Sequence, residues 1–119
     1  MDEQVQRALE TDRVIDITTT GRKSGQPRRI EIWFRYLDGR VYITGRPGPR
    51  SWYANLVASP EFTFHVKQSA QGDLAARAWP IVDQAERREL FGRLLQGERA
   101  AEVPAWVAGA PLVEVEFEP

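Results

Sequence analysis

The stretch "RRIEIWFRYLDGRVYITG", residues 28–45, decides the fold. Apolar and charged side chains alternate through residues 28–37, which is typical of a strand with one buried face. Asp38 and Gly39 then supply the positive-φ positions that a tight hairpin needs, so residues 40–45 are predicted to return as the partner strand. The predicted inward face of the first strand holds Ile30, Ile32, Phe34 and Tyr36.

The rest of the chain adds short strands and a few helices to this hairpin. β-Branched and alternating segments predict the strands, and the apolar stripe of residues 84–95 predicts a helix. Six mostly antiparallel strands in so short a chain favour a small barrel, and the absence of strand–helix–strand alternation argues against a doubly wound nucleotide-binding sheet. The other predicted strands are 13–20, 61–68, 74–82 and 111–119, and the other predicted helices are 2–10, 52–58 and a turn near 104–107.

Capping residues set the expected helix and strand boundaries. Ser51 is the predicted N-cap of the helix at 52–58, and Pro60 closes that helix. Asp83, with Glu86 three residues later, has the spacing of a capping pair. A turn is expected around residues 72–73.

Composition excludes several classes of function. The 119 residues predict one domain, 1–119, with 42% hydrophobic and 28% charged residues. Cysteine is absent and His65 is the single histidine, so disulfides, cysteine-ligated zinc and multi-histidine metal sites are excluded. No apolar run could span a bilayer and the N-terminus does not resemble a signal sequence, so we expect a soluble, cytoplasmic protein with no metal.

Positive charge is concentrated in one part of the chain. Residues 20–50 hold eight Arg or Lys and two acidic residues, a local charge of +6 that leaves −7 for the remainder of a chain with net charge −1. Such segregation favours attraction of a small anion. The acidic remainder argues against nucleic acid as a partner and makes a polyanion-binding module the weakest hypothesis.

Two loops in this region favour anion binding. "GRKSG" (21–25) joins two strands, and its glycines permit backbone N–H groups to converge on a phosphate or carboxylate. "TGRPGPRSWYANL" (44–56) places a basic loop before a helix N-terminus, where free amides and the helix dipole favour anions. Aromatic residues between the charges could stack on a ring system. They are Trp33, Tyr42, Trp52 and Tyr53.

These segments resemble the deazaflavin-dependent nitroreductase family. The resemblance rests on "TTTGRKSGQPR", a strand ending in "DGRVYITG", and "WYANLVASPEF", which occur in order between residues 15 and 68. It implies a six-stranded split β-barrel, mainly β (α+β) and similar to FMN-binding barrels, with short flanking helices. It also implies an oxidoreductase that uses reduced coenzyme F420 to transfer a hydride to a quinone, nitro or activated-alkene acceptor.

The resemblance also implies cofactor-binding residues. The first segment corresponds to contacts with the cofactor's phosphate and polyglutamate tail, and the later segments correspond to the pocket of the deazaflavin ring. No catalytic side chain is implied, and His65 is a candidate proton donor only because it is the sole histidine. The contacts that the resemblance implies are Arg22, Lys23, Ser24, Gly25 and Arg28 for the tail, and Thr44, Gly45, Arg46, Trp52, Tyr53, Asn55 and Leu56 for the ring pocket. Trp33 is added as a cofactor contact because its flat side chain could stack on the ring.

The sequence leaves alternatives open. The loop "RPGPR" (46–50) and the tripeptide Glu31–Trp33 depart from the family pattern, and a tyrosine cluster found near the C-terminus of some members is missing. An FMN-binding split-barrel enzyme, or a non-catalytic flavin, haem or lipid carrier, is therefore the alternative, because one fold hosts several ligands. Surplus aromatic residues and the apolar C-terminal strand lead us to expect a homodimer.

Overall fold

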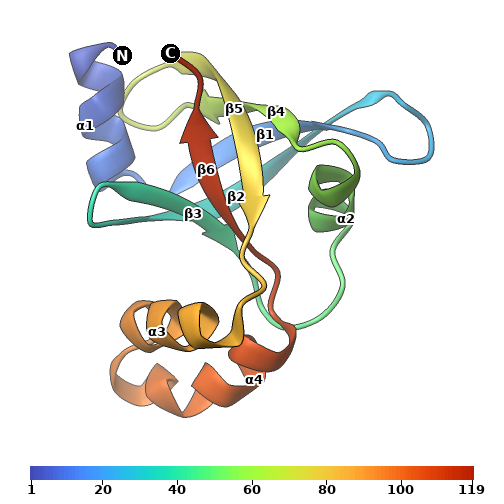
Figure 1. The fold of residues 1–119 in the computed structure, drawn as a ribbon. Coiled ribbons are helices and arrows are strands. Elements are labelled where there is room, and N and C mark those ends of the chain that lie inside the picture. Colours follow the sequence, from blue (N-terminus) through green and yellow to red (C-terminus); the bar gives the residue numbers. More distant parts are fainter.

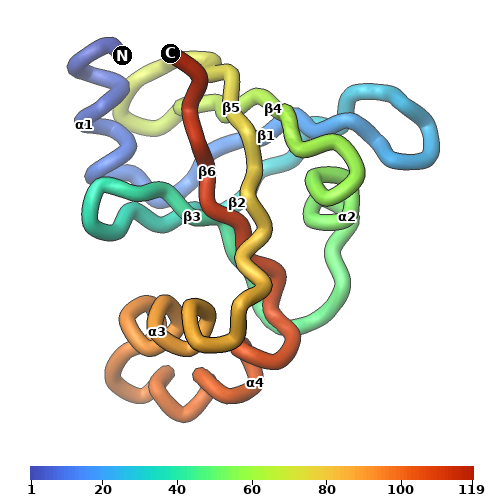
Figure 2. Tube along the Cα trace, viewed as in Figure 1, coloured from blue at the N-terminus to red at the C-terminus, as the bar shows by residue number.

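The computed structural model describes residues 1–119 as a six-stranded antiparallel barrel with four α-helices and one 3₁₀ helix (Figures 1 and 2). None of the helices has both the length and the apolar character that a bilayer crossing requires. The strands are β1 (Val14–Thr20), β2 (Pro27–Leu37), β3 (Arg40–Thr44), β4 (Glu61–Val66), β5 (Gly72–Pro80) and β6 (Leu112–Phe117). The helices are α1 (Glu3–Thr11), α2 (Ser51–Ala58), α3 (Gln84–Leu94), the 3₁₀ helix η1 (Gly97–Glu102) and α4 (Val103–Gly109).

The barrel closes in the strand order β1-β2-β3-β6-β5-β4. The predicted hairpin is confirmed: Asp38 and Gly39 have φ values of 53° and 79°, and β2 and β3 pair in antiparallel register. β6 lies between β3 and β5, so the last strand of the chain completes the wall. The predicted six-stranded split-barrel class is therefore confirmed.

Alternation along the strands builds a core inside the barrel. Phe34 from β2 meets Phe64 from β4 edge to face, with ring centroids 5.5 Å apart. Burying side chains of this size is worth roughly 1.5–3 kcal/mol each. On the predicted inward face of β2, Phe34 is buried, Ile32 and Tyr36 are partly buried against the core, and Ile30 is exposed.

A second core forms on the outside of the barrel. Figure 1 shows α3 and α4 together as a layer below the strands. Tyr42 on the outer face of β3 is buried beneath this layer, and burial together with Glu114 raises the pKa of its hydroxyl. Tyr42 therefore packs the helical layer and is not available for the ring stacking expected of it.

Several predicted boundaries were wrong. Gly72 and Asp73 begin β5 instead of forming a turn, because they pair with Val66 and His65. Ser51 is the first residue of α2 and not its cap; Arg50 holds the cap position without a side-chain hydrogen bond. Asp83 was correctly predicted, since its carboxylate accepts a hydrogen bond from the Glu86 amide at 2.9 Å.

The apolar residues of the final strand do not form an outer surface. Leu112, Val113 and Val115 are all buried, shared between the barrel core and the helical layer. The apolar character of this strand is therefore explained by the barrel, in which β6 is an internal strand, and it carries no argument for the expected homodimer.

Candidate functional site: two adjoining cavities on the barrel wall

The loop between β1 and β2 is a tight turn held by its own backbone. The Gly21 amide donates to the carbonyl of Gln26, and the Gly25 amide donates to the carbonyl of Gly21, both at 2.8 Å. Gly25 has φ of 69°, which favours glycine. A Cβ on Gly21 would stand 2.6 Å from Ser24 Oγ and 3.2 Å from the Gln26 carbonyl oxygen. The two glycines of the motif are therefore required by the turn itself.

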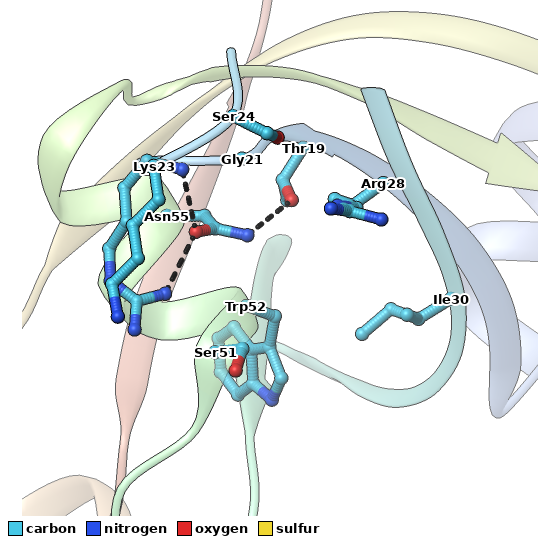
Figure 3. A pocket seen from close by; sticks show the side chains of 10 residues that line it. Thr19, Gly21, Lys23, Ser24, Arg28, Ile30, Ser51, Trp52 and Asn55 are labelled. Carbon is cyan, nitrogen blue, oxygen red and sulfur yellow. Dashed lines mark hydrogen bonds between the residues drawn. The ribbon is translucent and has the colours of Figure 1, made fainter. Parts of the chain in front are cut away.

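Asn55 of α2 ties this loop to the barrel (Figure 3). Its Oδ1 accepts hydrogen bonds from the backbone amide and from Nη1 of Arg22, both at 3.1 Å, and its Nδ2 donates to Thr19 Oγ1 at 3.2 Å. Asn55 and Thr19 are only 5% and 2% exposed, so these bonds form away from competing water. The sequence marked Asn55 as a pocket residue but did not reveal that it orients Arg22.

The loop, β2 and α2 enclose a cavity of about 530 Å³, which we call the basic cavity. Three cations face it, namely Arg22, Lys23 and Arg28, and none of them forms an ion pair. No carboxylate lines the cavity, so its positive charge is not neutralised by the protein. Its lining residues are Thr19, Gly21, Arg22, Lys23, Ser24, Arg28, Ile30, Ser51, Trp52 and Asn55.

The expected convergence of backbone amides in this loop is mostly wrong. The amides of Gly21, Arg22, Gly25 and Gln26 all donate within the protein, the last of them to Ser24 Oγ at 3.1 Å. Recognition of an anion by the loop therefore depends mainly on charged side chains.

The second predicted anion site, the N-terminus of α2, is not blocked by a capping side chain. Helix α2 has no side-chain cap and no acidic residue in its first turn. Ser51 and Trp52 of that turn line the basic cavity. The partial positive charge of the helix N-terminus therefore adds to the field of the loop cations.

A second cavity of about 560 Å³ adjoins the first, and we call it the aromatic cavity. Trp52 lines both cavities and forms their common wall. Strand β2 and the end of β3 supply one side, and α3, η1 and α4 supply the other. The lining residues are Glu31, Ile32, Trp33, Arg35, Thr44, Gly45, Arg46, Arg50, Trp52, Phe91, Leu94, Leu95, Arg99 and Trp106.

Most of the predicted site residues gather at these two cavities, and three do not. Gly25 lies on the far side of its loop, Tyr53 lines a separate depression beside Arg87, and Leu56 is fully buried in the core beneath Trp52. The sequence missed the contribution of Arg35, Arg99 and Trp106. A strand-face pattern placed Arg35 outward, but nothing in the sequence showed that η1 and α4 would pack opposite it.

His65 lies outside both cavities, on the outer face of β4. Its Nδ1 is 2.7 Å from the Asp73 carboxylate, and its Nε2 is 2.7 Å from Thr18 Oγ1. The hydrogen bond from His65 lowers the pKa of Asp73. His65 is therefore a cross-strand structural residue and does not serve the site as a proton donor. No group of three metal-ligating side chains lies together.

The fold places the protein in the class of split-barrel proteins, and several solved structures share it. A solved structure described as an F420 reductase matches with a TM-score of 0.73 at 19% identity, covering 100% of this chain and 97% of that one. A conserved hypothetical protein from Mycobacterium tuberculosis matches with a TM-score of 0.73 at 16% identity, covering 100% and 82%. An FAD-binding protein from Mesorhizobium loti matches with a TM-score of 0.65 at 19% identity, covering 97% and 86%.

The particular family follows from the sequence match. The model of the F420H(2)-dependent quinone reductase family matches residues 1–108, so the chain belongs to that family. The protein is therefore an F420-dependent oxidoreductase, and coenzyme F420 is its cofactor. The resemblance found in residues 15–68 is confirmed.

Proposed function

We propose that this protein transfers a hydride from reduced F420 to a quinone, nitro or activated-alkene acceptor where the two cavities meet. The observation that carries the proposal is Trp52, which belongs to both a cationic cavity without acids and an aromatic cavity. A cofactor with an anionic tail and a flat ring system needs such a pair of environments side by side.

The residues present fit the cofactor. Arg22, Lys23 and Arg28 would hold the phosphate and glutamate tail, and each charge-assisted hydrogen bond is worth roughly 1.5–3 kcal/mol. Asn55 orients Arg22 before any ligand arrives, so less side-chain freedom is lost on binding. Thr44, Gly45, Arg46 and Trp52 would line the ring.

The protein's part in the reaction is to bind, orient and exclude water. Bound F420 in its reduced form supplies the hydride. The aromatic cavity contains no histidine or tyrosine, and its one carboxylate, Glu31, is bonded to Lys67. We therefore propose that water delivers any proton the product needs, while the walls of Trp52 and Trp106 keep bulk solvent from the reacting atoms.

Parallel titrations test the cofactor preference. Fluorescence titration of the purified protein with F420 and with FMN is expected to show tighter binding of F420, because its longer anionic tail can engage the basic cavity. Clear preference for FMN would favour an FMN-binding split-barrel enzyme. Binding of F420 without turnover of reduced F420 by any quinone, nitro or alkene acceptor would favour a non-catalytic carrier.

We also propose that the protein forms a homodimer. A structural neighbour described as a domain-swapped dimer matches with a TM-score of 0.58 at 22% identity, covering 96% of this chain and 95% of that one. Trp79 is a large exposed aromatic residue outside the two cavities, and self-association could cover it. Light scattering at high concentration should give twice the chain mass; a monomer mass would contradict this.

A further inference from the structure

We propose that the hydride acceptor is an anionic aromatic compound, and that Arg35 and Arg99 bind its anionic group within the aromatic cavity. The inference rests on the proposed function, because it names the substrate class of the same site. It starts from four arginines that line a cavity expected to hold an uncharged quinone.

The cavity has more positive charge than the protein neutralises. Its arginines are Arg35, Arg46, Arg50 and Arg99. Only Arg99 has a carboxylate partner, Glu102 at 3.2 Å. The one acidic residue of the lining, Glu31, forms an ion pair with Lys67, which follows β4. With an uncharged acceptor, any arginine of this group that the cofactor does not reach would have no anionic ligand.

The position of each arginine in the chain separates Arg46 and Arg50 from Arg35. Arg46 and Arg50 flank the loop that leads to Trp52, so they lie toward the cofactor. Arg35 stands five residues beyond Ile30, the last β2 residue of the basic cavity, which is roughly 17 Å at about 3.3 Å per residue. Arg35 is therefore too far along the strand to serve the anionic tail held at Arg28.

Arg35 is a half-buried cation among like charges. Its one hydrogen bond is from Nη1 to the Leu94 carbonyl at 3.3 Å. Burial lowers the pKa of the Arg35 guanidinium, and the nearby charges of Arg13 and Arg99 lower it further. The protein supplies little that stabilises a cation in this position, so a bound anion would stabilise it.

The same end of the cavity suits a flat ring. Trp33 is 66% exposed beside Arg35 on β2, and Trp106 lies opposite with the Arg99 guanidinium 5.2 Å from its ring centroid. Leu94 and Leu95 add apolar surface. Trp106 is only 6% exposed and its ring is covered by Arg99, so Trp33 supplies the open aromatic face. An open aromatic face with Arg35 and Arg99 at the rim favours a planar acceptor that carries a carboxylate or sulfonate.

Equilibrium binding of two isosteric probes tests the inference without turnover. Naphthalene-2-carboxylate is expected to bind at least about tenfold more tightly than the neutral naphthalene-2-carboxamide, by calorimetry, both in the protein alone and in the protein saturated with F420. Arg35→Met and Arg99→Met should abolish the difference. Arg93→Met is the matched control, because Arg93 lies on α3 but pairs with Asp38 outside the cavity.

Turnover and fold controls complete the test. The KM for 1,4-naphthoquinone-2-sulfonate should rise about tenfold in Arg35→Met, with little change for 2-methyl-1,4-naphthoquinone. Because Arg35 joins β2 to α3, thermal melting is compared with Arg35→Lys, which keeps the charge and should retain most of the preference. If Arg35→Met fails to fold, the difference between carboxylate and carboxamide binding in Arg99→Met alone tests the inference.

The outcomes separate this inference from the proposed function. Equal affinity for the two probes, loss of carboxylate binding on F420 saturation, or a preference unchanged in both methionine variants would each overturn the inference. F420 binding with no probe preference would overturn it and leave the proposed function standing. A retained, Arg35-dependent preference in a protein that does not bind F420 would overturn the proposed function and leave only the anion site.

Discussion

Arg28 and Arg29 are adjacent in the sequence, but their side chains lie on different faces of β2. Arg28 faces the basic cavity and has no acidic partner. Arg29 points to the outer face of the barrel, where its Nε is 3.0 Å from Asp16 Oδ2. Lys67 joins the same network through Asp16 at 2.7 Å and through Glu31.

The difference shows how to tell a binding cation from a structural one in this molecule. On the outer face, acidic side chains on adjacent strands neutralise the bases, and His65, Asp73 and Thr18 satisfy one another in the same way. In the basic cavity the protein supplies cations without acids, and in the aromatic cavity only one of four arginines, Arg99, has a carboxylate partner. We therefore propose that unpaired charge, and not the number of charged residues, indicates where the ligand binds.

The largest expected effect concerns Arg87, a buried cation whose guanidinium is hydrogen-bonded to backbone carbonyl oxygens instead of to a carboxylate. It is 6% exposed and donates to the carbonyl oxygens of Ile81, Trp106, Val107 and Ala110 at 2.6–3.0 Å. Arg87→Met should lower the free energy of unfolding by about 3–5 kcal/mol, since several buried acceptors lose their donor. Urea denaturation measures this, with Arg88→Met on the exposed side of α3 as the matched control. Equal stability of the two variants would contradict it.

The next effect separates Arg28 from Arg29 directly. Arg28→Ala should weaken F420 binding about 10- to 150-fold, equivalent to roughly 1.5–3 kcal/mol, with an unchanged melting temperature. Arg29→Ala should leave the affinity unchanged and lower the melting temperature slightly. Lys23→Ala should behave like Arg28→Ala. The comparison fails if Arg28→Ala binds normally and melts early.

Raising the salt concentration should have a smaller effect on F420 affinity, and it tests whether the unpaired loop cations bind the cofactor. The Debye length shrinks from about 10 Å at 0.1 M to about 3 Å at 1 M, so the exposed loop cations are screened. F420 affinity should fall by about tenfold over this range, and the loss should be smaller for a fragment that lacks the phosphate and glutamate tail. Equal salt slopes in fluorescence titrations of the two ligands would show that "GRKSG" does not hold the tail.

The smallest effect tests the outer face. The hydrogen bond from Lys67 is the main cause that holds the pKa of Asp16 below its usual value of about 3.9. A carboxyl with a lowered pKa in the folded state adds stability above its unfolded pKa and loses it as the pH falls through the folded value. Asp16→Asn should therefore destabilise the protein at pH 7 by less than about 1 kcal/mol. The difference from the native chain should shrink below about pH 4; a constant difference in melting temperature would argue against the ion pair.

Local patterns were sufficient for most of the architecture. The hairpin at Asp38–Gly39, the capping of α3 by Asp83, and the six strands could be predicted, because turn chemistry and alternation act over a few residues. The boundary at residues 72–73 could not, since Gly72 and Asp73 are strand residues only through their pairing with β4. Such pairing depends on residues distant in the sequence.

By itself, the sequence determined that this chain is a small antiparallel barrel with a basic loop of GRKSG type, and its motifs were enough to indicate F420. Only the tertiary structure decided which bases are paired, because Asp16 lies on β1, Glu31 on β2 and Lys67 just after the end of β4. It also decided that Tyr42 is buried while Arg35 and Arg99 share a cavity. The physical reason is that the partners of a charge are set by sheet register and helix packing, which join residues far apart along the chain.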